Sequence, residues 1–170
     1  SVGLSAVDSG VTNIQAVDNL ICGNIFGIAY KNDSDVKDWS DLEGKDIAVL
    51  SSNFSVIFDP ILSAAGVDPS TVNYVTYSSS VYEALDSGQA AGMGTWISEY
   101  YMCDGMGYDW TYLSGNDVLP QIANSIWVNT DFAAENPDAV EGFVRAVNKA
   151  KYFCYVNPEA AADLQLATYP

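Results

Sequence analysis

Between residues 47 and 103 the sequence alternates strand patterns with helix patterns, and this order restricts the fold more than any other feature. The strongest strand pattern, at 47–50, has four consecutive apolar residues bounded by charge and serine, as in a strand buried on both faces. The patterns that follow are a helix at 56–65, a strand at 72–77, a helix at 81–86, a strand at 91–95 and a helix at 96–103. Their short connections predict an α/β domain in which a mostly parallel sheet is flanked by helices.

The flanking regions give further patterns. They predict a helix at 11–20, a strand at 25–30, a short helical turn that begins at Trp39 and ends at Gly44, and a strand at 122–128. Asn136-Pro137 begins a long helix to about Tyr155, and Asn157-Pro158 repeats the same kind of start. One face of the long helix is apolar and comprises Ala139, Val140, Phe143, Ala146, Val147, Ala150 and Phe153.

Charge and composition exclude several classes of function. Six Lys and Arg residues stand against 22 Asp and Glu residues, so the net charge is −16, which makes nucleic acid and anionic membranes poor partners. Because there is no histidine, the chain has no Ser/His or Cys/His pair and no imidazole metal ligand. Asp104 and Asp109 show no spacing that would pair them in a cleft. No enzyme activity, catalytic residue, cofactor or metal is therefore predicted.

The three cysteines give little information about the compartment. Cys22, Cys103 and Cys154 lie far apart and form no CxxC motif. One disulfide with one free thiol is an open alternative, but three buried small hydrophobic side chains are the favoured interpretation. No apolar run approaches the roughly 20 residues of a membrane helix, and residues 1–10 lack the basic start of a signal peptide.

Several motifs occur in the order found in one protein family. They are Asp33-Ser34 with Trp39-Ser40-Asp41-Leu42-Glu43-Gly44-Lys45-Asp46-Ile47-Ala48-Val49, Leu62-Ser63-Ala64-Ala65-Gly66-Val67-Asp68-Pro69, Glu83-Ala84-Leu85-Asp86-Ser87-Gly88-Gln89, Trp127-Val128-Asn129, Asn136-Pro137-Asp138-Ala139-Val140 and Asn157-Pro158-Glu159-Ala160-Ala161. Each motif is weak alone, but their order over residues 28–168 resembles bacterial periplasmic solute-binding proteins of ABC transporters. The branch that it resembles serves nitrate, sulfonate, taurine and thiamine-pyrimidine uptake. Ala91-Gly92 departs from the family, which usually has an aspartate there. Because such proteins are considerably longer than 170 residues, the resemblance implies that most of a first lobe is missing, either because the chain is a fragment or because it has been reduced.

The resemblance implies a type-II-like periplasmic binding protein lobe. Residues 1–34 would be a remnant of the first lobe with a hinge strand at 25–30, residues 35–120 the second α/β lobe, and residues 121–170 a return hinge strand at 125–129 with C-terminal helices. A small-molecule ligand would lie between the lobes at the carboxyl ends of the strands, and the protein would then dock on an ABC permease. The implied location is periplasmic or extracellular, with a lipoprotein anchor in the intact form. The same fold includes thiamine-pyrimidine synthases, but these use an active-site histidine, which this chain lacks.

Three segments at strand ends are the candidate ligand-binding site. The first is Ser51, Ser52, Asn53, Phe54 and Ser55, the second is Tyr77, Ser78 and Ser79, and the third is Thr95, Trp96 and Glu99. The first segment enters a helix, whose N-terminal N–H groups hold anions or carbonyls. The hydroxyls can hydrogen-bond a ligand, Trp96 can stack on a planar ring, and Glu99 can pair with a cation or a ring N–H. Helix capping by the serines and core packing by the aromatic residues remain the alternative interpretations, and Trp39, Trp110 and Trp127 are assigned to packing.

The charges of residues 35–120 bear on the ligand. This segment contains only Lys37 and Lys45 and no arginine, so it lacks a guanidinium clamp for an oxyanion. A neutral or cationic planar molecule, such as a pyrimidine, fits better than nitrate or a sulfonate. An alternative function is a detached lobe that acts as a sensory or protein-interaction module. The former cleft of such a module would be exposed. A lobe without its partner exposes apolar area, so the expected partner is the missing first lobe or a second copy in a domain-exchanged dimer.

Overall fold

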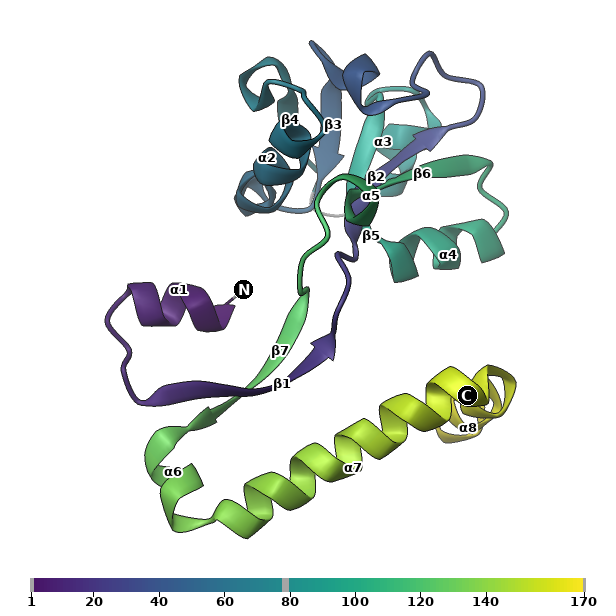
Figure 1. The fold of residues 1–170 in the computed structure, drawn as a ribbon. Helices are drawn as coiled ribbons and strands as arrows, with labels where there is room; N and C mark the ends of the chain where they lie inside the picture. The colour runs from purple at the N-terminus through teal and green to yellow at the C-terminus, as the bar shows by residue number, and fades with distance from the viewer. Residues whose placement is uncertain (1, 78–79, 170) are drawn as a thin grey trace. The chain divides into compact units, whose positions relative to one another are not determined.

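The computed structural model describes residues 2–77 and 80–169 and divides into two compact units (Figure 1). Unit 1 comprises Ser1–Cys22 and Ala123–Pro170, and unit 2 comprises Gly23–Ile122. Residues 23–34, which the sequence assigned to the first-lobe remnant, therefore cluster with unit 2. The reason is that the strand within this segment lies inside the sheet of unit 2.

Unit 2 is built on a five-stranded sheet with the order β4-β3-β5-β2-β6. The strands are β2 (Phe26–Lys31), β3 (Asp46–Val49), β4 (Asn73–Thr76), β5 (Gly92–Trp96) and β6 (Trp110–Ser114). β3 pairs in parallel with β4 and β5, whereas β2 is antiparallel to β5 and β6. The predicted mostly parallel sheet is thus confirmed, with one antiparallel strand, and β6 is a strand that the sequence analysis missed.

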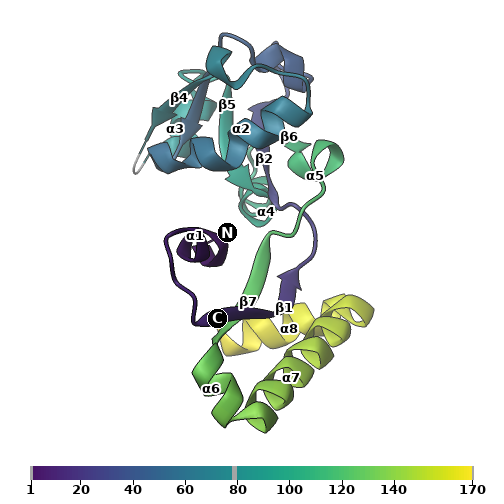
Figure 2. The same cartoon turned by 60° about the vertical axis from the view of Figure 1, so that its left-hand side comes forward.

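Helices cover both faces of this sheet (Figure 2). The helical segments of unit 2 are η1 (Trp39–Leu42), η2 (Ser52–Phe54), α2 (Ser55–Ala64), η3 (Pro69–Thr71), α3 (Val81–Asp86), α4 (Ile97–Gly105) and α5 (Gly115–Val118). α2 contributes Phe58, Ile61 and Leu62 to the apolar cluster on one face. α3 and α4 contribute Leu85 and Cys103 to the cluster on the other. This arrangement leaves the ends of the strands, rather than the sheet faces, open to a ligand.

Unit 1 contains a two-stranded antiparallel sheet and four helices. Its elements are α1 (Val2–Asp8), β1 (Ile14–Ile21), β7 (Asn124–Asn129), α6 (Thr130–Glu135), α7 (Pro137–Val156) and α8 (Pro158–Thr168). The helix predicted at 11–20 is wrong, because residues 14–21 form a strand that pairs with β7, more than a hundred residues later. Of the two segments expected to be hinge strands, 25–30 forms β2 in the sheet of unit 2, and 125–129 lies in β7, which pairs with β1.

Unit 1 shows no buried core among the residues whose burial is described. Among the described residues, all those that are buried belong to unit 2. The apolar face predicted for α7 exists, but Val140 and Val147 are only half-buried, while Phe143 and Phe153 are 56% and 38% exposed. The Lys151 ammonium joins α7 to β1 by an ion pair of 2.8 Å with Asp18. A two-stranded sheet is only marginally stable by itself.

The cysteines and tryptophans test the packing assignments directly. All three cysteines are free thiols, and only Cys103 is buried, so the expected burial of Cys22 and Cys154 is wrong. Trp39 and Trp110 are buried, as predicted, and Trp127 is half-buried. Within the described ranges, no helix combines the length and the apolar character needed to cross a membrane.

Candidate functional site

Three strand ends meet at one edge of the unit 2 sheet. β4, β3 and β5 are adjacent and parallel, and Val49 at the end of β3 pairs with Thr76 at the end of β4. The segments that follow these strands therefore start from the same edge, which we call the carboxyl edge. β2 begins here as well, because Phe26 pairs with Trp96. The three candidate segments named from the sequence are thus brought to one edge, the position where open α/β sheets generally hold ligands.

The first segment forms η2 and leads into α2. Ser51 accepts a hydrogen bond from the backbone N–H of Asn53 at 3.4 Å, and the Ser55 hydroxyl donates to the Ser52 carbonyl at 3.2 Å. Phe54 stacks on the buried Phe58, with ring centroids 5.9 Å apart. The hydroxyls of Ser51 and Ser55 therefore form hydrogen bonds with backbone groups of the same segment, and Phe54 packs against the core. Since Phe54 also occupies the N-cap position of α2, no side chain caps this helix.

The second segment is only partly described. Tyr77 donates its backbone N–H to the Val49 carbonyl at 2.9 Å, which extends the pairing of β3 with β4, and its ring packs on the apolar cluster of α3 and α4. Ser78 and Ser79 lie outside the described residues. Ser80 stands at the N-cap of α3 but makes no capping hydrogen bond with its side chain.

The third segment forms a hydrogen-bonded group around Glu99. Thr95, which is 1% exposed, donates its hydroxyl to one carboxylate oxygen of Glu99, and Tyr82 donates its hydroxyl to the other at 2.5 Å. Burial, assisted by Glu99, raises the pKa of Tyr82 well above its ordinary value, so the phenol stays protonated and remains a donor. Among the described residues, no Lys or Arg lies within ion-pair distance of Glu99. Sequence reasoning missed Tyr82, because only the tertiary contact between α3 and α4 brings it to Glu99.

The cations of unit 2 lie away from the carboxyl edge. Lys31 ends β2, which runs antiparallel to its neighbour β5, and Lys45 precedes β3. The Lys37 ammonium donates to the carbonyl of Asn32, in the turn after β2, at 2.7 Å. All three lysines therefore belong to the opposite edge of the sheet. The carboxyl edge offers backbone N–H groups, hydroxyls, aromatic rings and the carboxylate of Glu99.

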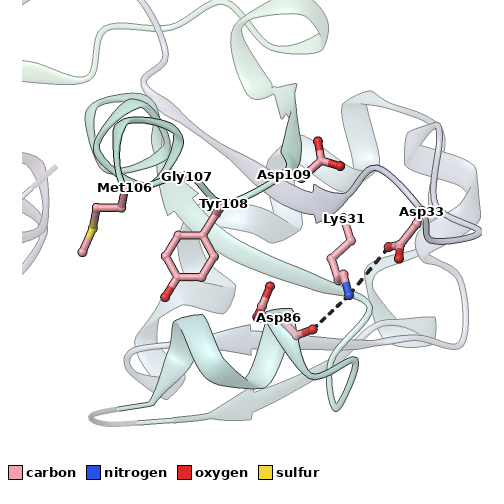
Figure 3. A pocket seen from close by; sticks show the side chains of 7 residues that line it. All are labelled: Lys31, Asp33, Asp86, Met106, Gly107, Tyr108 and Asp109. Atoms are coloured by element: carbon pink, nitrogen blue, oxygen red, sulfur yellow. Dashed lines mark hydrogen bonds and ion pairs between the residues drawn. The ribbon is translucent and has the colours of Figure 1, made fainter.

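Two cavities of unit 2, of about 420 and 270 Å³, also lie at the opposite edge. Figure 3 shows the larger one, with the Lys31 ammonium between Asp33 and Asp86. The ammonium donates to the Asp86 carbonyl at 2.9 Å and stands 3.7 Å from the Asp33 carboxylate. Neither cavity is lined by any of the residues predicted from the sequence to contact a ligand. In the described ranges no cluster of acidic or cysteine side chains has the arrangement needed to hold a metal ion.

Comparison with known proteins identifies the fold. The family model described as NMT1/THI5 like matches residues 4–161. The periplasmic aliphatic sulphonate binding protein SsuA from Escherichia coli is similar in structure, with 16% identity, a TM-score of 0.67, and coverage of 95% of this chain and 62% of that one. The alkanesulfonate-binding protein SsuA from Xanthomonas axonopodis pv. citri, bound to MOPS, gives 15% identity, a TM-score of 0.71, and coverage of 96% and 58%.

A third similar structure is the ligand-binding component of an ABC-type import system from Staphylococcus aureus, with zinc bound. It gives 15% identity, a TM-score of 0.69, and coverage of 99% of this chain and 58% of that one. No curated protein matches the sequence. The chain thus spans about three-fifths of the solved structures that it resembles. The expected periplasmic-binding-protein fold is confirmed.

Proposed function

Because the chain belongs to the NMT1/THI5-like family, we propose that it binds a small solute outside the cytoplasm and presents it to the permease of an ABC importer. The observation that carries this proposal is the convergence of three parallel strand ends at the carboxyl edge of unit 2. In this proposal unit 2 is the second lobe, unit 1 holds the connecting strands with the C-terminal helices, and the protein is not an enzyme. The intact form is periplasmic or extracellular and lipid-anchored, which labelling with a radioactive fatty acid tests.

The ligand that we propose is a small planar molecule, neutral or cationic, of which an aminopyrimidine is an example. Support comes from the aromatic residues Phe54, Tyr77 and Trp96 and from the carboxylate of Glu99 at or beside the carboxyl edge. The three lysines of unit 2 belong to the other edge, so an alkanesulfonate would have to bind to amides and hydroxyls of unit 2 or to the missing lobe. The two sulfonate-binding structures named above share the fold at 15–16% identity, and their ligands do not transfer to this chain.

Calorimetry with an aminopyrimidine and with taurine tests this ligand class. We expect the aminopyrimidine to bind more tightly, and Trp96→Ala to weaken it because a stacking surface is lost. A matched control is Tyr101→Ala, which removes an aromatic ring that is 62% exposed on α4. Tighter binding of taurine, or equal effects of the two substitutions, would contradict the proposed ligand.

We also propose that further polypeptide covers unit 1. Support comes from the described residues of unit 1, none of which is buried, and from the exposed Phe143 and Phe153 on α7. Either a first lobe or a second copy in a domain-exchanged dimer can provide this cover. The second candidate function, a detached lobe that acts as a sensory or protein-interaction module, rests on the same exposed face.

Sedimentation of the chain across the micromolar range distinguishes these alternatives. Concentration-dependent dimers that Phe143→Ser weakens would support a second copy. The matched control Tyr152→Ser changes an aromatic residue of α7 that is 69% exposed and lies off the predicted apolar face. A monomer that binds no hydrophobic dye at any concentration would refute the need for cover.

A further inference from the structure

Glu99 differs from the other acidic residues of unit 2 because hydroxyl groups from two different elements hold its carboxylate. Thr95 is the fourth residue of β5, and Tyr82 is the second residue of α3, whereas Glu99 lies in the first turn of α4. Each hydroxyl donates to a different carboxylate oxygen. Hydrogen bonds from both sides fix the plane of the carboxylate as well as its position, as in other preorganised binding groups.

The Glu99 carboxylate retains capacity to accept further hydrogen bonds. An ionised carboxylate has about four lone-pair positions, and the two hydroxyls use two of them. Glu99 is half-buried, and in the described part of the chain no Lys or Arg lies within ion-pair distance of it. A pair of parallel N–H donors is the partner that matches two oxygens held in a fixed plane.

Tyr82 is held more rigidly than its exposure would suggest. Its ring lies 6.3 Å from the ring of Tyr108 and 6.4 Å from that of the buried Trp110, so aromatic packing restricts its rotation. Burial raises its pKa, and the phenol therefore remains a donor throughout the neutral range. Tyr82 joins α3 to α4 through Glu99, so the orientation of the carboxylate depends on the packing of both helices.

We propose that Tyr82 is the positioning residue for Glu99, and that Glu99 binds a ligand with two adjacent N–H donors, such as an aminopyrimidinium, amidinium or guanidinium group. This inference rests on the proposed solute-binding function and narrows its ligand class. A sulfonate or carboxylate in the same place would face an uncompensated like charge, which disfavours binding. Tyr82 itself need not touch the ligand, because it acts by holding the carboxylate.

Calorimetry with benzamidine, with 4-aminopyrimidine and with the uncharged amide benzamide tests the proposal. We expect Glu99→Gln to weaken benzamidine binding about a hundredfold, because a charge-assisted pair of hydrogen bonds is lost. Tyr82→Phe should weaken it about tenfold, because a hydrogen bond to a charged group contributes on the order of 1.5–3 kcal/mol. The matched control is Tyr100→Phe, which removes a hydroxyl that donates to the Trp110 carbonyl at 3.3 Å and makes no contact with Glu99 in this hydrogen bond.

The ratio of benzamidine to benzamide affinity separates positioning from a general loss of structure. A merely structural effect of Tyr82→Phe would weaken both probes equally, whereas loss of carboxylate orientation reduces the preference for benzamidine. If the wild type binds both probes and Tyr82→Phe behaves like Tyr100→Phe, the role of Tyr82 is refuted while the solute-binding function stands. If the wild type binds taurine but not benzamidine or 4-aminopyrimidine, the ligand class is refuted. If it binds none of the four compounds, both this inference and the pyrimidine-like ligand of the proposed function are overturned.

Discussion

Replacing Phe58 with alanine is the sharpest test of how unit 2 supports its carboxyl edge. Phe58 is 0% exposed, and its ring lies 5.9 Å from Phe54, 6.3 Å from Phe26 and 6.4 Å from Tyr74. Truncation of a buried phenylalanine generally costs about 3–5 kcal/mol, because transfer energy is lost and a cavity remains. Such a loss is a large part of the roughly 5–15 kcal/mol by which a domain is stable. The neighbouring Phe54 would also lose the ring on which it stacks.

Urea unfolding followed by tryptophan fluorescence measures the effect, since the buried Trp39 and Trp110 both report on unit 2. For a slope of about 2 kcal/mol/M, we expect the midpoint to fall by about 2 M. The control Tyr101→Ala, at an exposed position, should change the free energy of unfolding by less than about 0.5 kcal/mol. A loss below about 1.5 kcal/mol for Phe58→Ala would refute the packing described for this face.

Three further predictions concern other parts of the chain. Gly27→Ala should destabilise unit 2 by about 1–3 kcal/mol in thermal unfolding, because the added Cβ would meet the Leu113 carbonyl at 2.2 Å; an unchanged melting temperature would contradict this. The hydrogen bond from Lys151 lowers the pKa of Asp18 in the folded chain. The ion pair should therefore stabilise the β1–α7 contact at any pH above the carboxyl pKa of the unfolded chain, about 3.9. This stabilisation should be lost as the pH falls through the lower pKa that Asp18 has in the folded chain. Hydrogen exchange in β1 should show this acid dependence in the wild type and not in Asp18→Asn. Burial raises the pKa of Cys103, so titration with a thiol reagent should find two cysteines that react rapidly and one that reacts slowly. Rapid reaction of all three thiols would contradict the burial of Cys103.

Local sequence patterns predicted most elements of unit 2. The run at 47–50 indicated a strand, and β3 (Asp46–Val49) confirms it, because a strand between two neighbours must be apolar on both faces. The helix starts at Asn136-Pro137 and Asn157-Pro158 were also predicted correctly, since proline at the first helical position is a local signal. The three candidate segments reach one edge because parallel strands have their carboxyl ends together.

Long-range pairing explains where the sequence interpretation was wrong. The segment at 11–20 carries a weak pattern, and its strand structure comes from pairing with β7. β7 pairs with residues more than a hundred positions earlier in the chain, and no local pattern records such a pairing. The exposure of Cys22 and Cys154 depends likewise on what packs around them.

By itself, the sequence determined most of the strands and helices of unit 2, the acidic charge and the three segments that follow strands, because these depend on neighbouring residues and on composition. Only the tertiary structure decided which strands pair, that β2 runs antiparallel, and that Tyr82 holds Glu99. The physical reason is that residues far apart in the chain make these contacts. Their free energy depends on the packing of whole elements, which no local pattern of residues records.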